Sequence, residues 1–285
     1  MRRIGEIVCF AILLTAGSSS SGQQLAQGES WEIPFRLYEG FAIVLRGSIG
    51  TLQDCNLLID TGASPTLVDE RIVRKLHLES TKSTLPTVAG NVPVAQTMIP
   101  TIEIGPFKKA GVLTAVRDLN ALSERIGVHV DALVGLDVLG DSNLRINYER
   151  RVIAFSNDAA ENTAGITALD SGAPLVVLPM TMNRQQIHVL FDTGSFGLVL
   201  FANHMADALP NTSEPNGPFR SIEGEIELRP VRVQDAAIGD LHLGPSHAFL
   251  ARGPNGASFD GVLGPKGLNA REVLLDLKRG QLAWH

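Results

Sequence analysis

The chain has 285 residues, of which 44% are apolar and 19% are charged, and its formal net charge is −6. These proportions exclude disordered and collagen-like chains and are typical of a globular protein with one large domain or two of moderate size. The mildly acidic charge provides no basic surface for nucleic acid or an anionic membrane, so we expect neither as a partner.

The first residues have the pattern of an export signal. Arg2 and Arg3 precede an apolar stretch from Ile7 to Ala16, and the small polar segment "GSSSSGQQ" follows. This stretch is too short for a membrane-spanning helix, which needs about 20 apolar residues, but it fits a signal peptide. We predict that residues 1–28 form a signal peptide and a short N-terminal segment, and that the protein is exported to the periplasm or the exterior. An uncleaved signal is the only membrane contact left open.

The next 130 or so residues predict mainly β-structure, judged by apolar runs that end at turn residues. The run Phe41 to Ile49 is followed by a second apolar run that ends at Asp60, which favours a hairpin. Two short helices are expected, at 69–78 ("DERIVRKLHL") and at Leu119 to Ile126, with a further hairpin around Gly90.

The second half of the chain repeats this order. Leu175 to Met182 and the run ending at Asp192 predict a hairpin, "ANHMADALP" at 202–210 predicts a short helix, and Gly224 marks another hairpin. The small, polar segment from Ser156 to Pro174 has the composition of an interdomain connection. We therefore expect an N-terminal lobe at 31–156, a linker at 157–174 and a C-terminal lobe at 175–285.

Five landmarks recur in the same order in the two halves, which indicates a duplicated unit. Asp60 and Asp192 are 132 residues apart, and the segments around them, "NLLIDTGASPTLV" and "IHVLFDTGSFGLVL", are alike. The other matched pairs are Gly90 with Gly224, Ile104-Gly105 with Ile238-Gly239, "DALVGLDVLG" with "DGVLGPKGL", and the strand pairs that begin at Leu144 and Val273.

The two Asp-Thr-Gly segments combine residues that suit acid–base chemistry. The apolar residues before Asp60 and Asp192 place each carboxyl at the end of a buried strand, where ionising it alone is costly. Glycine permits a tight turn, and the threonine hydroxyl can bond to the backbone. If a pseudo-twofold relation brings the loops face to face, the carboxyls share one proton and act as general acid and general base on a water.

These motifs resemble those of the aspartic proteases, in a single-chain, two-lobed form with retropepsin-like halves. The resemblance covers residues 35 to 285, and it implies a mainly β fold of two homologous barrel lobes about a pseudo-twofold axis, with the active-site cleft between them. It assigns Asp60 and Asp192 as the catalytic dyad, which shares a proton in this family. It assigns loop support to six neighbouring residues, namely Thr61, Gly62, Ala63, Thr193, Gly194 and Ser195. The supporting apolar-apolar-glycine marks of the family are present as Leu133-Val134-Gly135 and Val262-Leu263-Gly264.

The expected flaps over the substrate differ from those of pepsin-like enzymes. Neither "TVAGNVPVAQ" nor "SIEGEIELRP" contains the flap tyrosine of those enzymes, which favours a retropepsin-like flap from each lobe. Backbone and aliphatic contacts of this kind suit an extended peptide. The predicted flap residues are Val88, Ala89, Gly90, Asn91, Glu223, Gly224 and Glu225.

The residue after each Asp-Thr-Gly differs between the halves. Ser195 can donate a hydrogen bond to Asp192 and favour its charged form, whereas Ala63 cannot do so for Asp60. We therefore expect Asp192 to be the ionised partner, Asp60 the protonated one, and the activity optimum to be less acidic than in relatives with two hydroxyls.

Other chemistries find little support in the sequence. The seven histidines are scattered without metal-ligand spacing, so we expect no metal and no cofactor. "GSFG" at 194–197 does not match a serine-nucleophile elbow. Cys55 has no histidine partner nearby in the sequence and is interpreted as a structural thiol.

Two functions are consistent with these patterns. The favoured one is an aspartic endopeptidase, a monomer whose partner is a peptide or protein substrate. The alternative is a catalytically silent module of the same fold that binds a peptide or a partner protein without cutting it.

Overall fold

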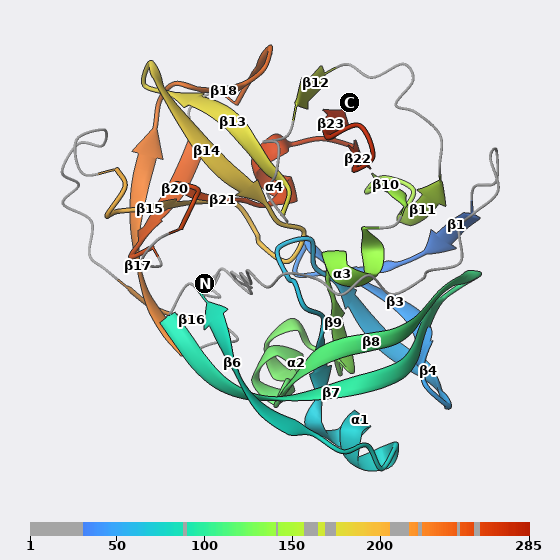
Figure 1. Ribbon diagram of the computed structural model, residues 1–285. Helices are drawn as coiled ribbons and strands as arrows, with labels where there is room; N and C mark the ends of the chain where they lie inside the picture. Colours follow the sequence, from blue (N-terminus) through green and yellow to red (C-terminus); the bar gives the residue numbers. More distant parts are fainter. Residues whose placement is uncertain are drawn as a thin grey trace.

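The computed structural model describes residues 31–87, 90–140, 142–156, 165–168, 175–205, 217–221, 224–243, 246–253 and 257–285. These residues form two β-lobes and a third sheet that both lobes share (Figure 1). The predicted signal peptide lies outside the described residues. Within them, no helix is long and apolar enough to cross a membrane.

Lobe 1 is built on an eight-stranded sheet with the order β2-β3-β4-β9-β5-β8-β7-β6. Its strands are β2 (Arg36–Tyr38), β3 (Ala42–Ile49), β4 (Leu52–Ile59), β5 (Leu67–Asp69), β6 (Thr81–Thr87), β7 (Gly90–Ile104), β8 (Phe107–Arg117) and β9 (Ala132–Val134). The predicted hairpin before Asp60 is the antiparallel pair β3–β4.

Lobe 2 is built on a nine-stranded sheet with the order β16-β17-β20-β15-β21-β14-β13-β18-β19. Its strands are β13 (Val177–Met182), β14 (Gln185–Phe191), β15 (Leu198–Phe201), β16 (Gly217–Ser221), β17 (Gly224–Val233), β18 (Ala236–Ile238), β19 (Leu241–His242), β20 (Ser246–Ala251) and β21 (Gly261–Leu263). Its first hairpin, β13–β14, matches β3–β4.

The centres of the two lobes have the same topology. In lobe 1, β4 pairs parallel with β9, β9 pairs antiparallel with β5, and β5 pairs parallel with β8. In lobe 2, β14, β21, β15 and β20 pair in the same sequence and with the same directions. This confirms the predicted mainly β fold of two homologous lobes with a pseudo-twofold relation.

The third sheet joins the lobes, with the order β1-β11-β10-β22-β23-β12. Its strands are β1 (Trp31–Pro34), β10 (Asn143–Asn147), β11 (Val152–Ser156), β12 (Gly165–Ala168), β22 (Glu272–Asp276) and β23 (Gln281–Trp284). The lobes meet in it where β10 pairs with β22. The predicted linker at 157–174 is therefore more than a connection, because β12 within it adds an edge strand to β23.

Four short helices accompany the strands: α1 (Glu70–Lys75), α2 (Asn120–Ile126), α3 (Leu136–Leu139) and α4 (Pro265–Leu268). Helix α1 begins where the Asp69 carboxylate accepts the backbone N–H of Arg71, and α2 ends at Gly127, whose φ of 74° suits glycine. Both confirm predicted helices. Of the helix expected at 202–210, Ala202 to His204 form a turn and the residues beyond Met205 lie outside the described part.

Candidate active site

The two aspartates lie at the ends of two matching strands. Asp60 follows β4 and donates its backbone N–H to the Val134 carbonyl at 3.0 Å, and Asp192 follows β14 and donates to the Leu263 carbonyl, also at 3.0 Å. Each strand is central in its sheet, so the residues before the aspartate are buried on both faces. Both aspartates are 0% exposed. The carboxyls therefore lie in an interior where charge is costly.

Glycine is required because each carboxyl packs against the opposite loop. A Cβ placed on Gly62 would lie 2.6 Å from Asp192 Cγ, and one placed on Gly194 would lie 2.9 Å from Asp60 Cγ. Any side chain here would push the two aspartates apart. The structure thus brings together Asp60 and Asp192, as the sequence predicted.

The threonines lock the loops to each other through four hydrogen bonds. Thr61 Oγ1 donates to the Phe191 carbonyl at 3.0 Å and accepts the Thr193 backbone N–H at 3.1 Å. Reciprocally, Thr193 Oγ1 donates to the Ile59 carbonyl at 2.9 Å and accepts the Thr61 backbone N–H at 3.1 Å. Each hydroxyl uses its donor and one acceptor site across the lobe boundary, so neither loop can move alone.

One oxygen of each carboxyl is held by its own loop. Gly62 N–H donates to Asp60 Oδ1 at 3.0 Å, and Gly194 N–H donates to Asp192 Oδ1 at 2.7 Å. The other oxygens, Asp60 Oδ2 and Asp192 Oδ2, are buried and have no hydrogen-bond donor among the described residues. Two unpartnered carboxylate oxygens side by side can both be satisfied by one shared proton.

Burial raises the pKa values of both carboxyls, and the charge of Asp60 adds to the rise at Asp192. Burial raises the pKa of Asp60 to about 6, although the Asp192 carboxyl and the Gly62 N–H oppose this. Burial, and then the Asp60 charge, raise the pKa of Asp192 well above its ordinary value. Near neutral pH the pair therefore holds one proton and one negative charge, which gives a general acid and a general base in one place.

The two residues that follow the motifs are both buried, but the expected role of Ser195 is not seen. Ala63 N–H and Ser195 N–H close the same turn by donating to the carbonyls of Asp60 and Asp192. The Ser195 hydroxyl is buried and has no hydrogen-bond partner in the described part of the chain, so it does not donate to Asp192. The predicted preference for an ionised Asp192 loses its physical basis, because the hydroxyl was its only source.

The two apolar-apolar-glycine segments, Leu133-Val134-Gly135 and Val262-Leu263-Gly264, support the loops from behind. A Cβ on Gly135 would lie 2.3 Å from the Ala63 carbonyl oxygen, and one on Gly264 would lie 2.2 Å from the Ser195 carbonyl oxygen. Only glycine leaves room for these loops to rest directly on β9 and β21. The two lobes therefore share this support, as expected.

Behind the first loop lies a polar brace that the sequence did not reveal. Asp137, in α3, accepts the Thr66 backbone N–H at 2.9 Å and the Thr66 hydroxyl at 2.8 Å. The Thr66 hydroxyl in turn accepts the Gly135 N–H at 3.0 Å. Burial raises the pKa of Asp137, and the two Thr66 donors oppose the shift. The repeat gave no signal for this pair, since Thr66 and Asp137 align with Leu198 and Lys266 of the second half.

The second loop is braced by aromatic and cationic contacts instead. The Lys266 ammonium lies 4.3 Å from the centroid of the Phe196 ring, and Phe196 meets Phe41 of lobe 1 edge to face at 5.7 Å. These are favourable geometries for cation–π and aromatic pairs. The contact crosses from lobe 2 to lobe 1 directly beside the active-site loop.

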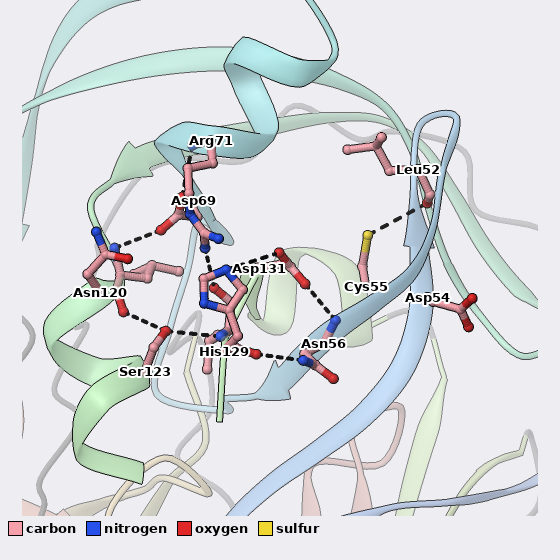
Figure 2. A network of polar contacts seen from close by, with 12 residues as sticks. Leu52, Asp54, Cys55, Asn56, Asp69, Arg71, Asn120, Ser123, His129 and Asp131 are labelled. Atoms are coloured by element: carbon pink, nitrogen blue, oxygen red, sulfur yellow. Dashed lines mark hydrogen bonds and ion pairs between the residues drawn. The ribbon is translucent and has the colours of Figure 1, made fainter. Parts of the chain in front are cut away.

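A second pair of matched aspartates fixes the outer ends of the strands. In lobe 1, Asp131 Oδ2 accepts the Asn56 N–H at 2.8 Å, within a network that includes Asp69 and Arg71 (Figure 2). In lobe 2, Asp260 Oδ2 accepts the His188 N–H at 2.8 Å. Asp131 and Asp260 open the repeated segments found in the sequence, where their structural role could not be seen.

The predicted flaps are only partly described. Strands β6 and β7 pair as far as Thr87 and Gly90, and β16 and β17 pair as far as Ser221 and Gly224. A hairpin therefore occurs at each predicted place. Val88, Ala89 and Glu223 lie outside the described residues, and for Gly90, Asn91, Gly224 and Glu225 only the backbone is described.

The remaining candidate groups are not drawn into the site. Cys55 is a buried free thiol on β4, 3.6 Å from the Leu52 carbonyl oxygen (Figure 2). Over the part of the chain that the structure covers, no group of three or more His, Cys, Asp or Glu residues is arranged to hold a metal ion.

Comparisons with known proteins agree with this geometry. The model of the aspartyl protease family matches residues 45–138 and 177–265, which include both Asp-Thr-Gly segments. No curated protein matches the chain. Among solved structures, the chain is similar to an aspartic proteinase from Irpex lacteus, with 12% sequence identity, a TM-score of 0.53, and coverage of 90% of this chain and 97% of that chain. At this identity, the structural likeness is evidence for the fold alone.

Proposed function

This chain belongs to the aspartyl protease family, and we propose that it is an aspartic endopeptidase that hydrolyses peptide bonds with Asp60 and Asp192. The observation that carries the proposal is the pair of buried, unpartnered oxygens, Asp60 Oδ2 and Asp192 Oδ2, with raised pKa values on both carboxyls. A buried carboxyl pair is costly to keep, and an idle turn would not need it.

The chemistry follows from the shared proton. The ionised carboxyl takes a proton from a water as the water oxygen attacks the peptide carbonyl carbon, while the protonated carboxyl donates its proton to the carbonyl oxygen. The C–N bond of the tetrahedral intermediate then breaks as the newly protonated carboxyl donates its proton to the leaving nitrogen and the other carboxyl takes a proton from one of the two hydroxyl groups of the intermediate. The pair ends with one proton, as it began, so no cofactor is consumed.

The threonine lock supports this mechanism by holding the pair in position. Bringing the water, the acid and the base into one geometry removes much of the entropic part of the barrier. The four hydrogen bonds of Thr61 and Thr193 are made between lobes, so the arrangement needs both halves of the chain.

The proposal extends to flaps, export and assembly. One hairpin in each lobe supports two retropepsin-like flaps over an extended peptide substrate. Arg2, Arg3 and the short apolar stretch after them support export through a cleaved signal. A chain that carries both aspartates needs no second copy, which supports a monomer.

The test is cleavage of a mixed peptide library between about pH 3 and pH 8 by the wild type, an Asp60→Asn variant and an Asp54→Asn control. Asp54 is exposed and lies in lobe 1, so the control matches the chemical change without touching the pair. We expect the Asp60 variant to lose roughly 10³-fold or more of the activity, and a statine-type transition-state mimic to inhibit the wild type.

Two outcomes would contradict the proposal. Equal cleavage by the wild type and the Asp60→Asn variant would assign the activity to another site or to a contaminant. Binding of the mimic without cleavage at any pH would favour the silent, peptide-binding alternative.

A further inference from the structure

The segment that runs from β9 into α3 is hydrogen-bonded to the first active-site loop close to the catalytic carboxyl. At the beginning of the loop, the Asp60 N–H donates to the Val134 carbonyl at 3.0 Å. In the middle, the Leu136 N–H donates to the Ala63 carbonyl at 2.9 Å, and the Ala63 N–H donates to the Asp60 carbonyl at 3.2 Å. The position of this segment therefore determines the position of the Asp60 backbone.

Asp137 fastens the end of the loop to the same segment. Its carboxylate accepts the Thr66 N–H, at 2.9 Å to Oδ1 and 3.0 Å to Oδ2, and the Thr66 hydroxyl at 2.8 Å. The hydroxyl also accepts the Gly135 N–H at 3.0 Å, and Gly135 packs directly on the Ala63 carbonyl. Because Thr66 is 0% exposed, its two donors depend on the carboxylate and not on solvent.

The second active-site loop cannot form these bonds. The position that matches Leu136 is Pro265, which has no N–H to donate. The position that matches Thr66 is Leu198, which has no hydroxyl group. Lobe 2 nevertheless has the same strand pairings at its centre. The fold of a lobe therefore does not require the acidic brace, which belongs to the loop of Asp60 alone.

We propose that Asp137 is a positioning residue for hydrolysis: by fixing Thr66, it holds the Asp60 carboxyl opposite its partner. The inference rests on the proposed function, because it concerns the geometry of the same carboxyl pair. Asp137 acts through the loop and does not touch the reacting atoms. Since a displacement of about 1 Å can cost about 100-fold in rate, loosening the brace should lower kcat more than it changes KM.

Steady-state cleavage of a peptide by two variants of Asp137 tests this inference. Asp137→Leu has a similar volume and no acceptor, and we expect its kcat to fall about 30-fold or more while KM stays within about threefold. Asp137→Asn keeps one carbonyl oxygen that accepts from both donors of Thr66, so it should retain at least about one-third of the wild-type kcat.

A variant at Thr66 tests the route through which Asp137 acts. Thr66→Val removes the hydroxyl, keeps the backbone N–H and should lower kcat about fivefold to tenfold. If both residues act as one brace, the double variant should lose much less than the product of the two single losses. Thr66→Val is the milder change, and it carries the test if Asp137→Leu does not fold.

Asp276 supplies a matched control far from the active-site loops. It lies in β22 of the joining sheet, is 0% exposed, and accepts the N–H and the guanidinium of Arg279 at 3.0 and 2.9 Å. Asp276→Leu should lower the urea midpoint as Asp137→Leu does, but leave kcat within about twofold. Titration with the statine-type mimic counts the active sites, so that loss of folded protein is not read as loss of kcat.

Binding of the same mimic, measured by calorimetry, gives a readout that needs no cleavage. The mimic matches the transition state, so a displaced carboxyl pair binds it more weakly. We expect Asp137→Leu to weaken its binding about tenfold, and Asp137→Asn and Asp276→Leu to change it less than about threefold.

The outcomes separate this inference from the proposed function. Wild-type kcat per active site in Asp137→Leu, a loss confined to KM, or an equal loss in Asp276→Leu overturns the positioning role alone. A wild type that binds the mimic without cleaving peptides contradicts the endopeptidase, and weaker binding by Asp137→Leu still supports the positioning role. If the wild type neither cleaves peptides nor binds the mimic, both proposals fail.

Discussion

The two lobes present the same Asp-Thr-Gly loop but support it differently. Each has a central strand, a glycine under the opposite carboxyl and a threonine bonded across the boundary, in closely matching geometry. Behind lobe 1 the brace is polar, through Thr66 and Asp137, and behind lobe 2 it is aromatic and cationic, through Phe196 and Lys266. The two loops are therefore equivalent where the two carboxyls meet, while the scaffold behind each loop differs.

The largest effect should come from breaking the part that the lobes share. Gly62→Ala and Gly194→Ala each place a methyl group within 3 Å of the opposite carboxyl carbon. We expect each to lower kcat/KM by about 100-fold or more, since even a 1 Å displacement of catalytic groups can cost that much. The two variants should behave alike in steady-state assays, and a large difference between them would contradict the equivalence of the loops.

The pH dependence of kcat/KM tests the raised pKa values of the two carboxyls. Because burial raises the pKa of Asp60 to about 6, the singly protonated pair is depleted as the pH falls below that value. We expect the acid limb of the kcat/KM profile near pH 6 and an optimum well above that of a strongly acidic protease. A maximum near pH 2 would contradict the raised pKa values.

The free energy of unfolding should change with pH in the opposite direction to the activity. The pKa of Asp60 is higher in the folded protein than the unfolded value of 3.8, so the native protein binds more protons. The stabilisation that comes from protonated Asp60 is therefore complete below about pH 4 and is lost as the pH rises through about 6. At pH 7, Asp60→Asn should therefore be more stable than the wild type by roughly 1–3 kcal/mol, while inactive. Urea unfolding at pH 4 and pH 7 measures this, and a variant less stable at both values would argue against a costly carboxyl pair.

Changing the braces should reveal their difference. Asp137→Ala leaves the buried Thr66 donors unpaired and should lower the free energy of unfolding by about 2 kcal/mol. Lys266→Ala removes an exposed cation–π contact and should cost about 0.5 kcal/mol. Denaturant titrations compare the two, and equal losses would show that the lobe 2 brace is as important as the polar one.

The smallest effect is expected from making the loops chemically identical. Ser195→Ala removes a buried hydroxyl that has no partner among the described residues. Because an unpaired hydroxyl is costly to bury, stability should be unchanged or rise by up to about 1 kcal/mol, and kcat should change by less than about threefold. A tenfold loss of activity with a shifted acid limb would restore the hydrogen bond to Asp192 that the sequence suggested.

The sequence was sufficient for the fold and for the pairing of the two carboxyls because both depend on local patterns that occur twice. Apolar runs ending in Asp-Thr-Gly place the carboxyls, and the repeat implies that the two loops face each other. The Thr66–Asp137 pair joins residues 71 positions apart, and Lys266 acts through a ring that is near only in space. No repeat or periodicity in the sequence indicates contacts between residues that are close only in space.

The segment 157–174 contains another feature that the sequence pattern did not reveal. Its small, polar composition predicted a connection at 157–174, but Gly165 to Ala168 pair with β23. Backbone hydrogen bonds to a neighbouring strand do not depend on the side chains, so an edge strand can have the composition of a loop. The Ser195 expectation was wrong for a related reason, since residue identity alone does not fix where a hydroxyl points.

The sheet that joins the lobes also has a consequence for the order of events during synthesis. Leu144 pairs with Leu275 and Ile146 with Val273, so β10 must wait for a strand made after almost all of lobe 2. Long-range pairings of this kind form late, because a long loop has to be closed first. A growing chain that has completed lobe 1 contains Asp60 but not yet Asp192. The protein therefore has a built-in delay, and under the proposed mechanism hydrolysis becomes possible only when the second half has folded against the first.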